Sequence, residues 1–278
     1  MDPILFAGGD RRTFAALSYM KQRGYPAAAY ALTERTPYRG KAAALILPFP
    51  CLKDGKLNAP LLPSPPTIEE LLEETGTDPA KTPVFGGPLE NNPFSDYTDL
   101  AQSEELKLRN AVTTAEGALA LLIQNTPRAI RGMSVLIVGY GAIGKRLAVL
   151  LKALGAKVTV AARKEKDRIE GELLGYKMQD TNRLSLAGIQ AVINTVPAHL
   201  FTAETLRGQE QILCFLELAS PPYGADPSTV KEQKIPYLPG PALPGKIAPV
   251  TAGEDLAKTV LSLLCKPKTK GSGQTLGT

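Results

Sequence analysis

The sequence predicts an α/β protein with two domains, each built around a parallel sheet. Short apolar runs alternate with amphipathic helical segments along most of the chain, and this alternation is typical of parallel sheets. A glycine-rich turn joins a strand to a helix in the middle of the chain rather than near its start. The length of 278 residues suits two domains of ordinary size.

The N-terminal domain is predicted over residues 1–126, as a flavodoxin- or Rossmann-like α/β domain that binds the substrate. Its strands are expected at residues 4–7, 27–31, 43–47 and 84–87. Thr67 and Glu70 have the spacing of a capping box at the start of a helix over 67–74. The proline-rich segment before this helix is too long for an ordinary connection, and it is either a functional lid or a surface excursion. A helical stretch over 103–124, either one helix or two helices with a break near 110–113, leads to the second domain.

The second domain, over residues 127–252, is predicted to be a doubly wound Rossmann domain. Its first strand, at 133–138, runs into a G-x-G-x-x-G turn and then a helix. Gly139 makes the tight turn, Gly141 admits a pyrophosphate, and Gly144 permits close packing of the helix on the strand. The helix N-terminus offers unpaired N–H groups to the phosphates. We therefore predict a dinucleotide site that contains Gly139, Tyr140, Gly141, Ala142, Ile143 and Gly144.

The end of the second strand of this domain indicates which dinucleotide binds. An NAD site usually has an Asp or Glu there, which accepts a bond from the ribose 2′-hydroxyl. This chain has Ala162, Arg163 and Lys164 instead, and the nearest acid is Glu165. Arg163 can form charge-assisted hydrogen bonds to a 2′-phosphate. We therefore predict NADP rather than NAD, with a merely solvated loop as the alternative for the two cations.

Two later strands of the domain end in further candidate cofactor residues. The candidates after the first of these strands are Asn194, Thr195, Val196 and Pro197. Side chains there can hydrogen-bond a nicotinamide ribose, although a proline that only stops the strand explains the same segment. After the next strand, Ala219 and Ser220 are expected beside the nicotinamide. Glu217 is costly to bury without a partner, so we expect it to bond nearby, in a structural or a functional role.

The closing part of the chain is rich in proline and glycine. Residues 239–253 are expected to follow a fixed, non-regular path, and Lys246 at its centre can present a cation to a carboxylate. A rigid connection back to the first domain explains the same residues. A helix over 253–265 is expected to join the first domain, with a cleft between the two domains. Residues 266–278 are predicted to be a flexible tail.

Composition and charge disfavour several classes of function. The net charge of +5 is spread along the chain without a dense basic block, so no nucleic-acid partner is expected. No apolar run reaches membrane-spanning length and the chain opens directly into a strand, so we expect a cytoplasmic protein without a membrane partner. Three scattered cysteines and a single histidine, His199, cannot build a metal site or a hydrolytic triad. We therefore expect no metal.

Several motifs together resemble one family, the A subunit of dipicolinate synthase from endospore-forming bacteria. They occur in order along nearly the whole chain, at residues 7–11, 46–48, 113–117, 138–144, 162–163, 193–197, 217–221 and 239–253. The glycine-rich turn and the Asn-Thr-Val-Pro segment are common to many dehydrogenases. The Gly-Gly-Asp-Arg segment near the N-terminus and the closing Pro-Gly-rich motif make the resemblance specific.

The resemblance implies an oxidoreductase that converts dihydrodipicolinate to dipicolinate during sporulation. It implies that the partner is a flavoprotein-like B subunit, in the mother-cell cytoplasm, and we also expect a homo-oligomer. Glu116 is the candidate proton acceptor, with helix capping as its alternative, and Lys246 is the candidate cation beside the reacting ring. The residues expected to bind the substrate are Asp10, Arg11, Thr113, Thr114, Pro244 and Gly245. Capping of the first helix is the alternative role for Asp10.

Two other functions fit the same residues. The first is a different two-domain NADP-dependent dehydrogenase that acts on a hydroxy or keto acid. It would be active alone and would ignore dihydrodipicolinate. The second is a non-catalytic nucleotide-binding assembly subunit whose partner carries out the chemistry. Electron transfer through a flavin of the B-type partner also stays open.

Overall fold

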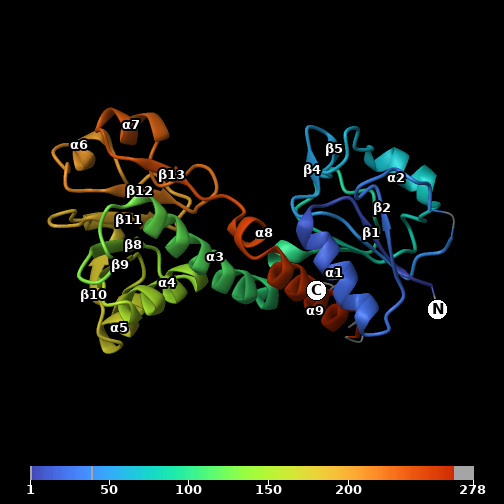
Figure 1. Cartoon of the computed structure of the whole chain (residues 1–278), viewed down its shortest axis with the longest axis horizontal. Helices are drawn as coiled ribbons and strands as arrows, with labels where there is room; N and C mark the ends of the chain where they lie inside the picture. Colours follow the sequence, from blue (N-terminus) through green and yellow to red (C-terminus); the bar gives the residue numbers. More distant parts are fainter. Residues whose placement is uncertain (1, 39, 266–278) are drawn as a thin grey trace, which may run out of the picture. The chain divides into compact units, whose positions relative to one another are not determined.

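The computed structural model describes residues 2–38 and 40–265 (Figure 1). The chain divides into two compact units: unit 1 runs to Leu106 and takes up the chain again at Val250, and unit 2 is Lys107–Pro249. Unit 1 contains a parallel sheet of five strands and unit 2 one of six. The predicted α/β fold class is therefore confirmed. The cleft between the domains stays a prediction, and the predicted tail lies outside the described residues.

The sheet of unit 1 has the strand order β2-β1-β3-β6-β7, and all neighbours pair in parallel. Its strands are β1 (Ile4–Ala7), β2 (Ala27–Tyr30), β3 (Ala44–Ile46), β6 (Val84–Gly86) and β7 (Tyr97–Asp99). Helix α2 (Ile68–Thr75) covers one face of this sheet and begins with the predicted capping box. The proline-rich segment contains a short antiparallel hairpin, β4 (Leu52–Lys53) and β5 (Lys56–Leu57).

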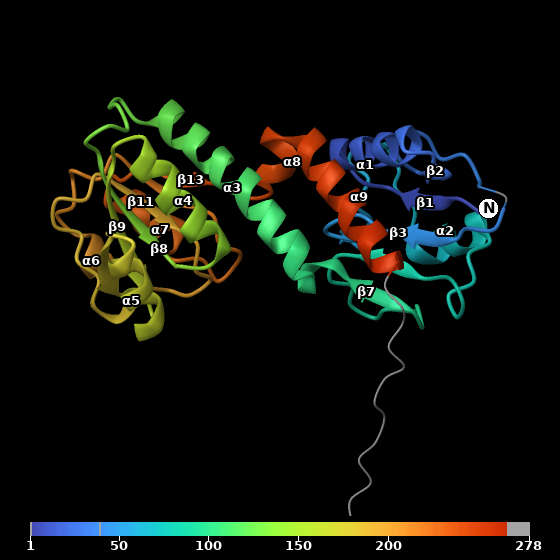
Figure 2. The same cartoon turned by 90° about the horizontal axis from the view of Figure 1, so that it is seen from below.

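Helices α1 (Arg11–Gln22) and α9 (Pro249–Cys265) cover the other face of the unit 1 sheet and lie side by side in Figures 1 and 2. The helix predicted over 253–265 therefore starts earlier, because proline fits the first turn of a helix, where its missing N–H costs nothing. Gly253 lies at the contact between the two helices. A Cβ at this position would be 2.2 Å from the Arg12 carbonyl oxygen and 2.6 Å from the Ala15 Cβ.

We expect Gly253→Ala to lower the free energy of unfolding by about 2 kcal/mol, because the added methyl group forces α9 away from α1. Alanine is otherwise the better helix former, so only the clash can make the change destabilising. Urea denaturation measures the effect. Thr251→Ala, at an exposed position of the same helix, is the control and should change stability by no more than about 0.5 kcal/mol. Unchanged stability in Gly253→Ala would show that the helices are not in close contact.

The sheet of unit 2 has the order β10-β9-β8-β11-β12-β13 and is parallel throughout. Its strands are β8 (Ser134–Val138), β9 (Lys157–Ala162), β10 (Lys177–Asp180), β11 (Ala191–Asn194), β12 (Cys214–Glu217) and β13 (Tyr237–Pro239). Counted from β8, this is the 3-2-1-4-5-6 order of the doubly wound Rossmann fold. The order of the strands changes direction between β8 and β11, so the loops that follow these two strands lead away from each other.

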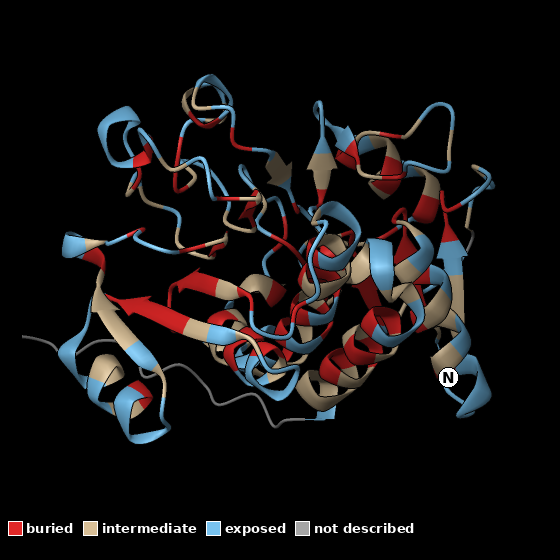
Figure 3. Cartoon of the chain, turned by 60° about the vertical axis from the view of Figure 1, so that its left-hand side comes forward, coloured by how far each residue is buried: buried red, intermediate tan, exposed pale blue. Residues whose placement is uncertain are grey.

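Helices cover both faces of the unit 2 sheet (Figure 1). Helices α3 (Glu104–Asn125) and α4 (Ala142–Ala153) pack on one face. Helices α6 (Ala203–Leu206) and α7 (Pro227–Glu232) pack on the other, and α5 (Glu165–Leu173) follows β9. Buried residues gather in the strands and on the inward sides of the helices (Figure 3).

Helix α3 is continuous, so the alternative of two helices with a break near 110–113 is wrong. Its buried residues Ala115, Ala118 and Leu122 join the core of unit 2, so this helix belongs mostly to unit 2 rather than to the first domain. The Thr113 hydroxyl donates to the Asn110 carbonyl oxygen at 3.2 Å, within the same helix. Burial of one apolar side therefore overrides the local capping pattern.

The path predicted to be non-regular after β13 also contains a helix. Residues Leu243–Ile247 form α8, with proline in the first turn, and Leu243 is buried. A Cβ at Gly117 of α3 would lie 3.0 Å from the Leu243 Cβ and 3.1 Å from an Ile247 side-chain carbon. A glycine in α3 thus lets α8 pack directly on it.

Within the described ranges 2–38 and 40–265, none of the helices is both long enough and apolar enough to cross a membrane. The same part of the chain contains no group of three or more His, Cys, Asp and Glu residues that could hold a metal ion. Cys51 and Cys214 are buried free thiols, and Cys265 is an exposed one.

Candidate functional site

The glycine-rich turn lies at the carboxyl end of β8. Gly139 has φ 106°, which side chains rarely adopt, and its N–H donates to the Ala161 carbonyl oxygen at 2.8 Å. A Cβ at Gly144 would lie 2.0 Å from the Gly139 carbonyl oxygen, so α4 packs directly on the turn. A Cβ at Gly141 would meet no described atom within 4 Å. The three glycines thus provide the tight turn, the close contact and the open approach that a dinucleotide turn requires.

A cavity of about 650 Å³ opens beside this turn, at the carboxyl ends of β8, β9 and β11. It contains nine of the predicted cofactor residues: Gly139, Tyr140, Gly141, Ala162, Arg163, Lys164, Thr195, Val196 and Pro197. Ala142, Ile143 and Gly144 form the first turn of α4 beside it. Residues that the sequence analysis missed also line the cavity: Asp167, Thr181, Asn182, Ala198 and Leu200. Thr181 and Asn182 directly follow β10, so the rule that ligands gather at strand carboxyl ends would have found them.

The cavity is positively polarised at two helix N-termini. Gly141 is the N-cap of α4 and has no side chain, and the side chain of Lys164, the N-cap of α5, makes no capping hydrogen bond. The first N–H groups of both helices therefore have no side-chain partner at the cap, and each helix dipole adds partial positive charge. Arg163 and Lys164 are exposed and add two cations, whereas Asp167 adds one carboxylate. This arrangement suits a ligand with several phosphate groups.

The basic pair is held by a residue that the sequence analysis did not select. The Arg168 guanidinium donates to the carbonyl oxygens of Ala162 at 3.0 Å and Arg163 at 2.8 Å, and lies 3.4 Å from an Asp180 carboxylate oxygen. Arg168 thereby fixes the backbone at the end of β9. The Arg163 side chain is left exposed at the edge of the cavity.

Asn194 lies beside the cavity but not on its wall. It is fully buried, and its amide nitrogen donates to the Val196 carbonyl oxygen at 2.9 Å and to Glu217 Oε1 at 2.7 Å. Both amide hydrogens are therefore used, and the predicted donation to a ribose would require one of these bonds to break. The Thr195 hydroxyl donates to the Val138 carbonyl oxygen at 2.8 Å. Thr195 consequently faces the cavity with an oxygen that can still accept.

A second cavity, of about 320 Å³, lies at the ends of β12 and β13. Its walls are Glu217, Ala219, Tyr223, Pro227, Lys231, Tyr237, Pro239 and Pro241. Ala219 is therefore in a cavity wall, whereas the predicted Ser220 is exposed on the loop. Burial raises the pKa of Tyr237 to about 12. The walls of this cavity are mainly apolar and aromatic.

Comparison with known proteins agrees with this geometry. Residues 111–210 match the family described as D-isomer specific 2-hydroxyacid dehydrogenase, NAD binding domain. The A subunit of dipicolinate synthase from Bacillus subtilis (strain 168) is 33% identical over 169 residues, which are 60% of this chain and 57% of that protein. The crystal structure of the dipicolinate synthase A subunit from Bacillus halodurans matches with a TM-score of 0.83 at 25% identity and covers 96% of this chain and 98% of that one.

The chain is a homologue of the A subunit of dipicolinate synthase. The crystal structure of the Bacillus subtilis protein supports this with a TM-score of 0.80, 25% identity and 95% coverage of both chains. The Salmonella D-lactate dehydrogenase structure, at 12% identity and a TM-score of 0.58, shares the fold alone; it covers 95% of this chain and 98% of that one. The predicted resemblance is confirmed, and unit 2 is an NAD(P)-binding domain of the 2-hydroxyacid dehydrogenase type. The chain matches a little over half the length of the Bacillus subtilis protein in sequence.

The predicted substrate residues of this dipicolinate synthase homologue fall into two groups. Glu116 and Lys246 are exposed on α3 and α8, the two helices that pack together at Gly117. Their neighbours on the same helices are Thr113, Thr114, Pro244 and Gly245. Thr113 is only 2% exposed and bonds within its helix, so it is the least accessible of the set. The structure therefore brings six of the eight predicted residues onto one pair of helices.

The other two predicted residues, Asp10 and Arg11, lie at the start of α1 in unit 1. Asp10 caps the helix by accepting from the Arg12 N–H at 2.9 Å, which is its alternative role. Arg12, not Arg11, pairs with the Asp10 carboxylate at 2.9 Å, and its guanidinium also donates to the Phe49 carbonyl oxygen at 2.7 Å. Arg11 is exposed. The Asp10 carboxylate occupies the N-terminus of α1 and repels other anions there, whereas the N-terminus of α4 has no carboxylate cap.

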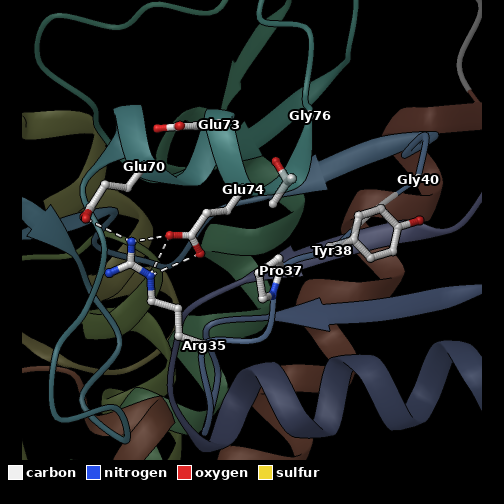
Figure 4. A pocket seen from close by; sticks show the side chains of 9 residues that line it. Arg35, Pro37, Tyr38, Gly40, Glu70, Glu73, Glu74 and Gly76 are labelled. Carbon is white, nitrogen blue, oxygen red and sulfur yellow. Dashed lines mark hydrogen bonds and ion pairs between the residues drawn. The ribbon is translucent and has the colours of Figure 1, made fainter.

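A further hollow, of about 580 Å³, lies in unit 1 beside α2 (Figure 4). Arg35 lies between two carboxylates there: it is 2.9 Å from Glu70 and also pairs with Glu74. The Tyr30 hydroxyl donates to Glu74 at 2.8 Å, and burial raises the pKa of Tyr30 to about 12. The guanidinium lowers the pKa of the Glu74 carboxyl. These bonds tie the segment after β2 to α2, which is a structural role.

Proposed function

We propose that the chain is the A subunit of dipicolinate synthase and that it oxidises dihydrodipicolinate to dipicolinate with NADP⁺. The main support is the larger cavity of unit 2, where two uncapped helix N-termini meet the cations Arg163 and Lys164. Such a site suits a dinucleotide with an additional phosphate. The substrate is suggested by the likeness to dipicolinate synthase A subunits.

The described residues fit a bound NADP(H). Gly141 leaves open space where a pyrophosphate has to approach, and the larger cavity lies within the size range of cofactor sites. We assign the loop at Ala219, which follows β12 and lines the smaller cavity, to the nicotinamide end, because ligands of such sheets gather at the carboxyl ends of the strands. When bound, NADP⁺ accepts the hydride that leaves the dihydropyridine ring as it becomes aromatic.

The chain has to bind two carboxylates and accept one proton. We assign the binding of a carboxylate to the Lys246 ammonium, because charge-assisted bonds to carboxylates are strong. We assign the proton to the Glu116 carboxylate, which is exposed on the neighbouring helix. Thr114, Pro244 and Gly245 extend this surface. The buried Thr113 and, from unit 1, Asp10 and Arg11 remain predicted substrate contacts. A B subunit, the mother-cell cytoplasm and a homo-oligomer belong to the same proposal.

The reaction is tested by supplying dihydrodipicolinate and NADP⁺ or NAD⁺ to the chain, with and without a matching B subunit. Ultraviolet absorbance follows dipicolinate. We expect product with the pair of proteins and faster turnover with NADP⁺. Product without any added nucleotide would point to electron transfer through the partner's flavin instead.

We expect Lys246→Ala to lower kcat/KM by about 100-fold, because an ion pair to a substrate carboxylate is lost. Glu116→Gln should lower kcat about 100-fold with little change in KM, as removal of a general base does. Lys177→Ala and Glu210→Gln change exposed residues of the same unit and serve as controls. Full activity of both test variants would favour the non-catalytic assembly subunit.

The match of residues 111–210 favours one second candidate, a dehydrogenase of hydroxy or keto acids. Such an enzyme would reduce a panel of 2-keto acids with NADPH in the absence of a B subunit. It would produce no dipicolinate. The same purified chain therefore distinguishes the two candidates.

A further inference from the structure

Glu217, the last residue of β12, is a buried carboxylate with three hydrogen bonds. Glu217 is only 3% exposed. Oε1 accepts from the Asn194 amide at 2.7 Å and from the Ala219 N–H at 2.9 Å, and Oε2 accepts from the Gly224 N–H at 2.8 Å. The predicted need for a nearby partner is therefore confirmed. All three partners are donors, so they suit an ionised carboxylate.

The first of these bonds controls the loop after β11. Asn194 and Glu217 are register partners on adjacent strands, and the carboxylate fixes the orientation of the Asn194 amide. That amide then binds Val196 twice, donating to its carbonyl oxygen at 2.9 Å and accepting from its N–H at 3.2 Å. Val196 is in the wall of the larger cavity. Glu217 thus holds this wall through Asn194.

The other two bonds hold the loop after β12. Ala219 is in the wall of the smaller cavity, and Gly224 closes the loop. A Cβ at Gly224 would lie 2.4 Å from the Asn194 amide nitrogen, so only glycine fits against this network. The Gly224 carbonyl oxygen accepts from the N–H of Leu200 at 2.9 Å, and Leu200 lines the larger cavity. One carboxylate therefore joins the walls of both cavities.

We infer that Glu217 is a positioning residue for the cofactor, which acts by tying the loop after β11 to the loop after β12. This inference rests on the proposed binding of NADP(H). Protonation of Glu217 weakens the tie, because the protonated oxygen carries a hydrogen for which none of the three bonded donors is an acceptor, and a neutral carboxyl accepts more weakly than a carboxylate. Cofactor affinity therefore falls when Glu217 is protonated.

The pH at which this happens is set by burial. Burial raises the pKa of Glu217, and the bonds from Gly224, Asn194 and Ala219 oppose that rise. Because the pKa of Glu217 is raised, the tie weakens at a higher pH than the pH at which an ordinary glutamate takes up its proton. The tie is complete at higher pH and weakens as the pH falls through the raised pKa.

Other ionisable groups face the same region. Tyr223, Tyr237 and Lys231 line the smaller cavity with Glu217, and Asp226 interacts electrostatically with Tyr237. Burial raises the pKa of Tyr237 to about 12, outside the range of the test. His199 is exposed on the loop after β11 and interacts electrostatically with Asp226, so a variant of His199 belongs in the test.

The test is the dissociation constant of NADPH, measured by fluorescence between about pH 5 and pH 8. We expect Glu217→Gln to bind about tenfold more weakly at the upper end, because the bonds it makes are weaker and one donor is left unpaired. The ratio of the two constants should approach one at the lower end, where the wild-type carboxyl is neutral. Ionisation of the 2′-phosphate affects both proteins and cancels in this ratio.

Three variants complete the design. His199→Gln should keep the wild-type pH dependence, and Glu210→Gln, which changes an exposed carboxylate, should match wild type throughout. Glu217→Asp retains a titrating carboxylate, so some pH dependence should return with it. The pH profiles of wild type and His199→Gln test the inference even if Glu217→Gln does not fold.

Two outcomes overturn the inference. One is equal affinity of Glu217→Gln and wild type for NADPH. The other is a ratio of the two dissociation constants that stays constant with pH, which indicates a purely structural residue.

Failure of the proposed function looks different, because wild type would then bind no NADPH at any pH. Hydrogen exchange at the Ala219 and Gly224 N–H groups still measures the tie in that case. Exchange that is no faster in Glu217→Gln than in wild type overturns it.

Discussion

Gly141→Ala is expected to weaken NADPH binding at least about 30-fold while leaving the melting temperature unchanged. The backbone at Gly141, with φ −79° and ψ −167°, is open to any residue, and a Cβ there meets no described atom within 4 Å. The methyl group would instead occupy the space through which a pyrophosphate reaches the N–H groups of α4. A fluorescence titration with NADPH and a thermal unfolding curve measure the two effects separately.

Gly144→Ala is the matched control for this effect, because it makes the same chemical change three residues away. Its Cβ would lie 2.0 Å from the Gly139 carbonyl oxygen, so α4 would have to leave the turn. We expect a loss of about 3 kcal/mol in the free energy of unfolding. Wild-type affinity in Gly141→Ala would show that the phosphates do not approach this turn.

Arg163→Asp is expected to raise the dissociation constant of NADPH about 100-fold and that of NADH no more than about threefold. A charge-assisted bond to the 2′-phosphate is lost, and a carboxylate is placed beside the same phosphate. NADH has a hydroxyl at that position, which a carboxylate can accept from. Titration of each nucleotide gives the ratio directly.

Arg207→Asp makes the same change of charge at an exposed position of unit 2 that is not part of the larger cavity. It controls for the long-range effect of net charge on an anionic ligand. Equal losses for NADPH and NADH in Arg163→Asp would contradict the 2′-phosphate contact. They would favour the alternative that the basic pair is a solvated loop.

Features that depend on neighbouring residues were predictable from the sequence. The glycine-rich turn is one, because its Gly-x-Gly-x-x-Gly spacing between a strand and a helix is a local pattern. The two parallel sheets and the capping box of α2 are others, since alternating strands and helices and a Thr-x-x-Glu spacing are local patterns. Local patterns also misled at the supposed break in α3, where burial of one side of the helix intervened, and at the start of α9, where proline fits the first turn.

Bonding partners far apart in the sequence were decided only by the tertiary structure. Asn194 looked like a ribose contact, yet its amide is used by Glu217, 23 residues away. Arg12 rather than Arg11 pairs with Asp10 at the start of α1, and its guanidinium also donates to the Phe49 carbonyl oxygen, 37 residues away.

The sequence by itself determined the class of fold, the dinucleotide turn and the basic pair after β9. Those features follow from backbone sterics and from the order of residues along the chain. The structure decided which polar side chains remain available to a ligand. A hydrogen-bonding group in a protein core is satisfied by whatever the fold brings to it, and sequence spacing does not encode that choice.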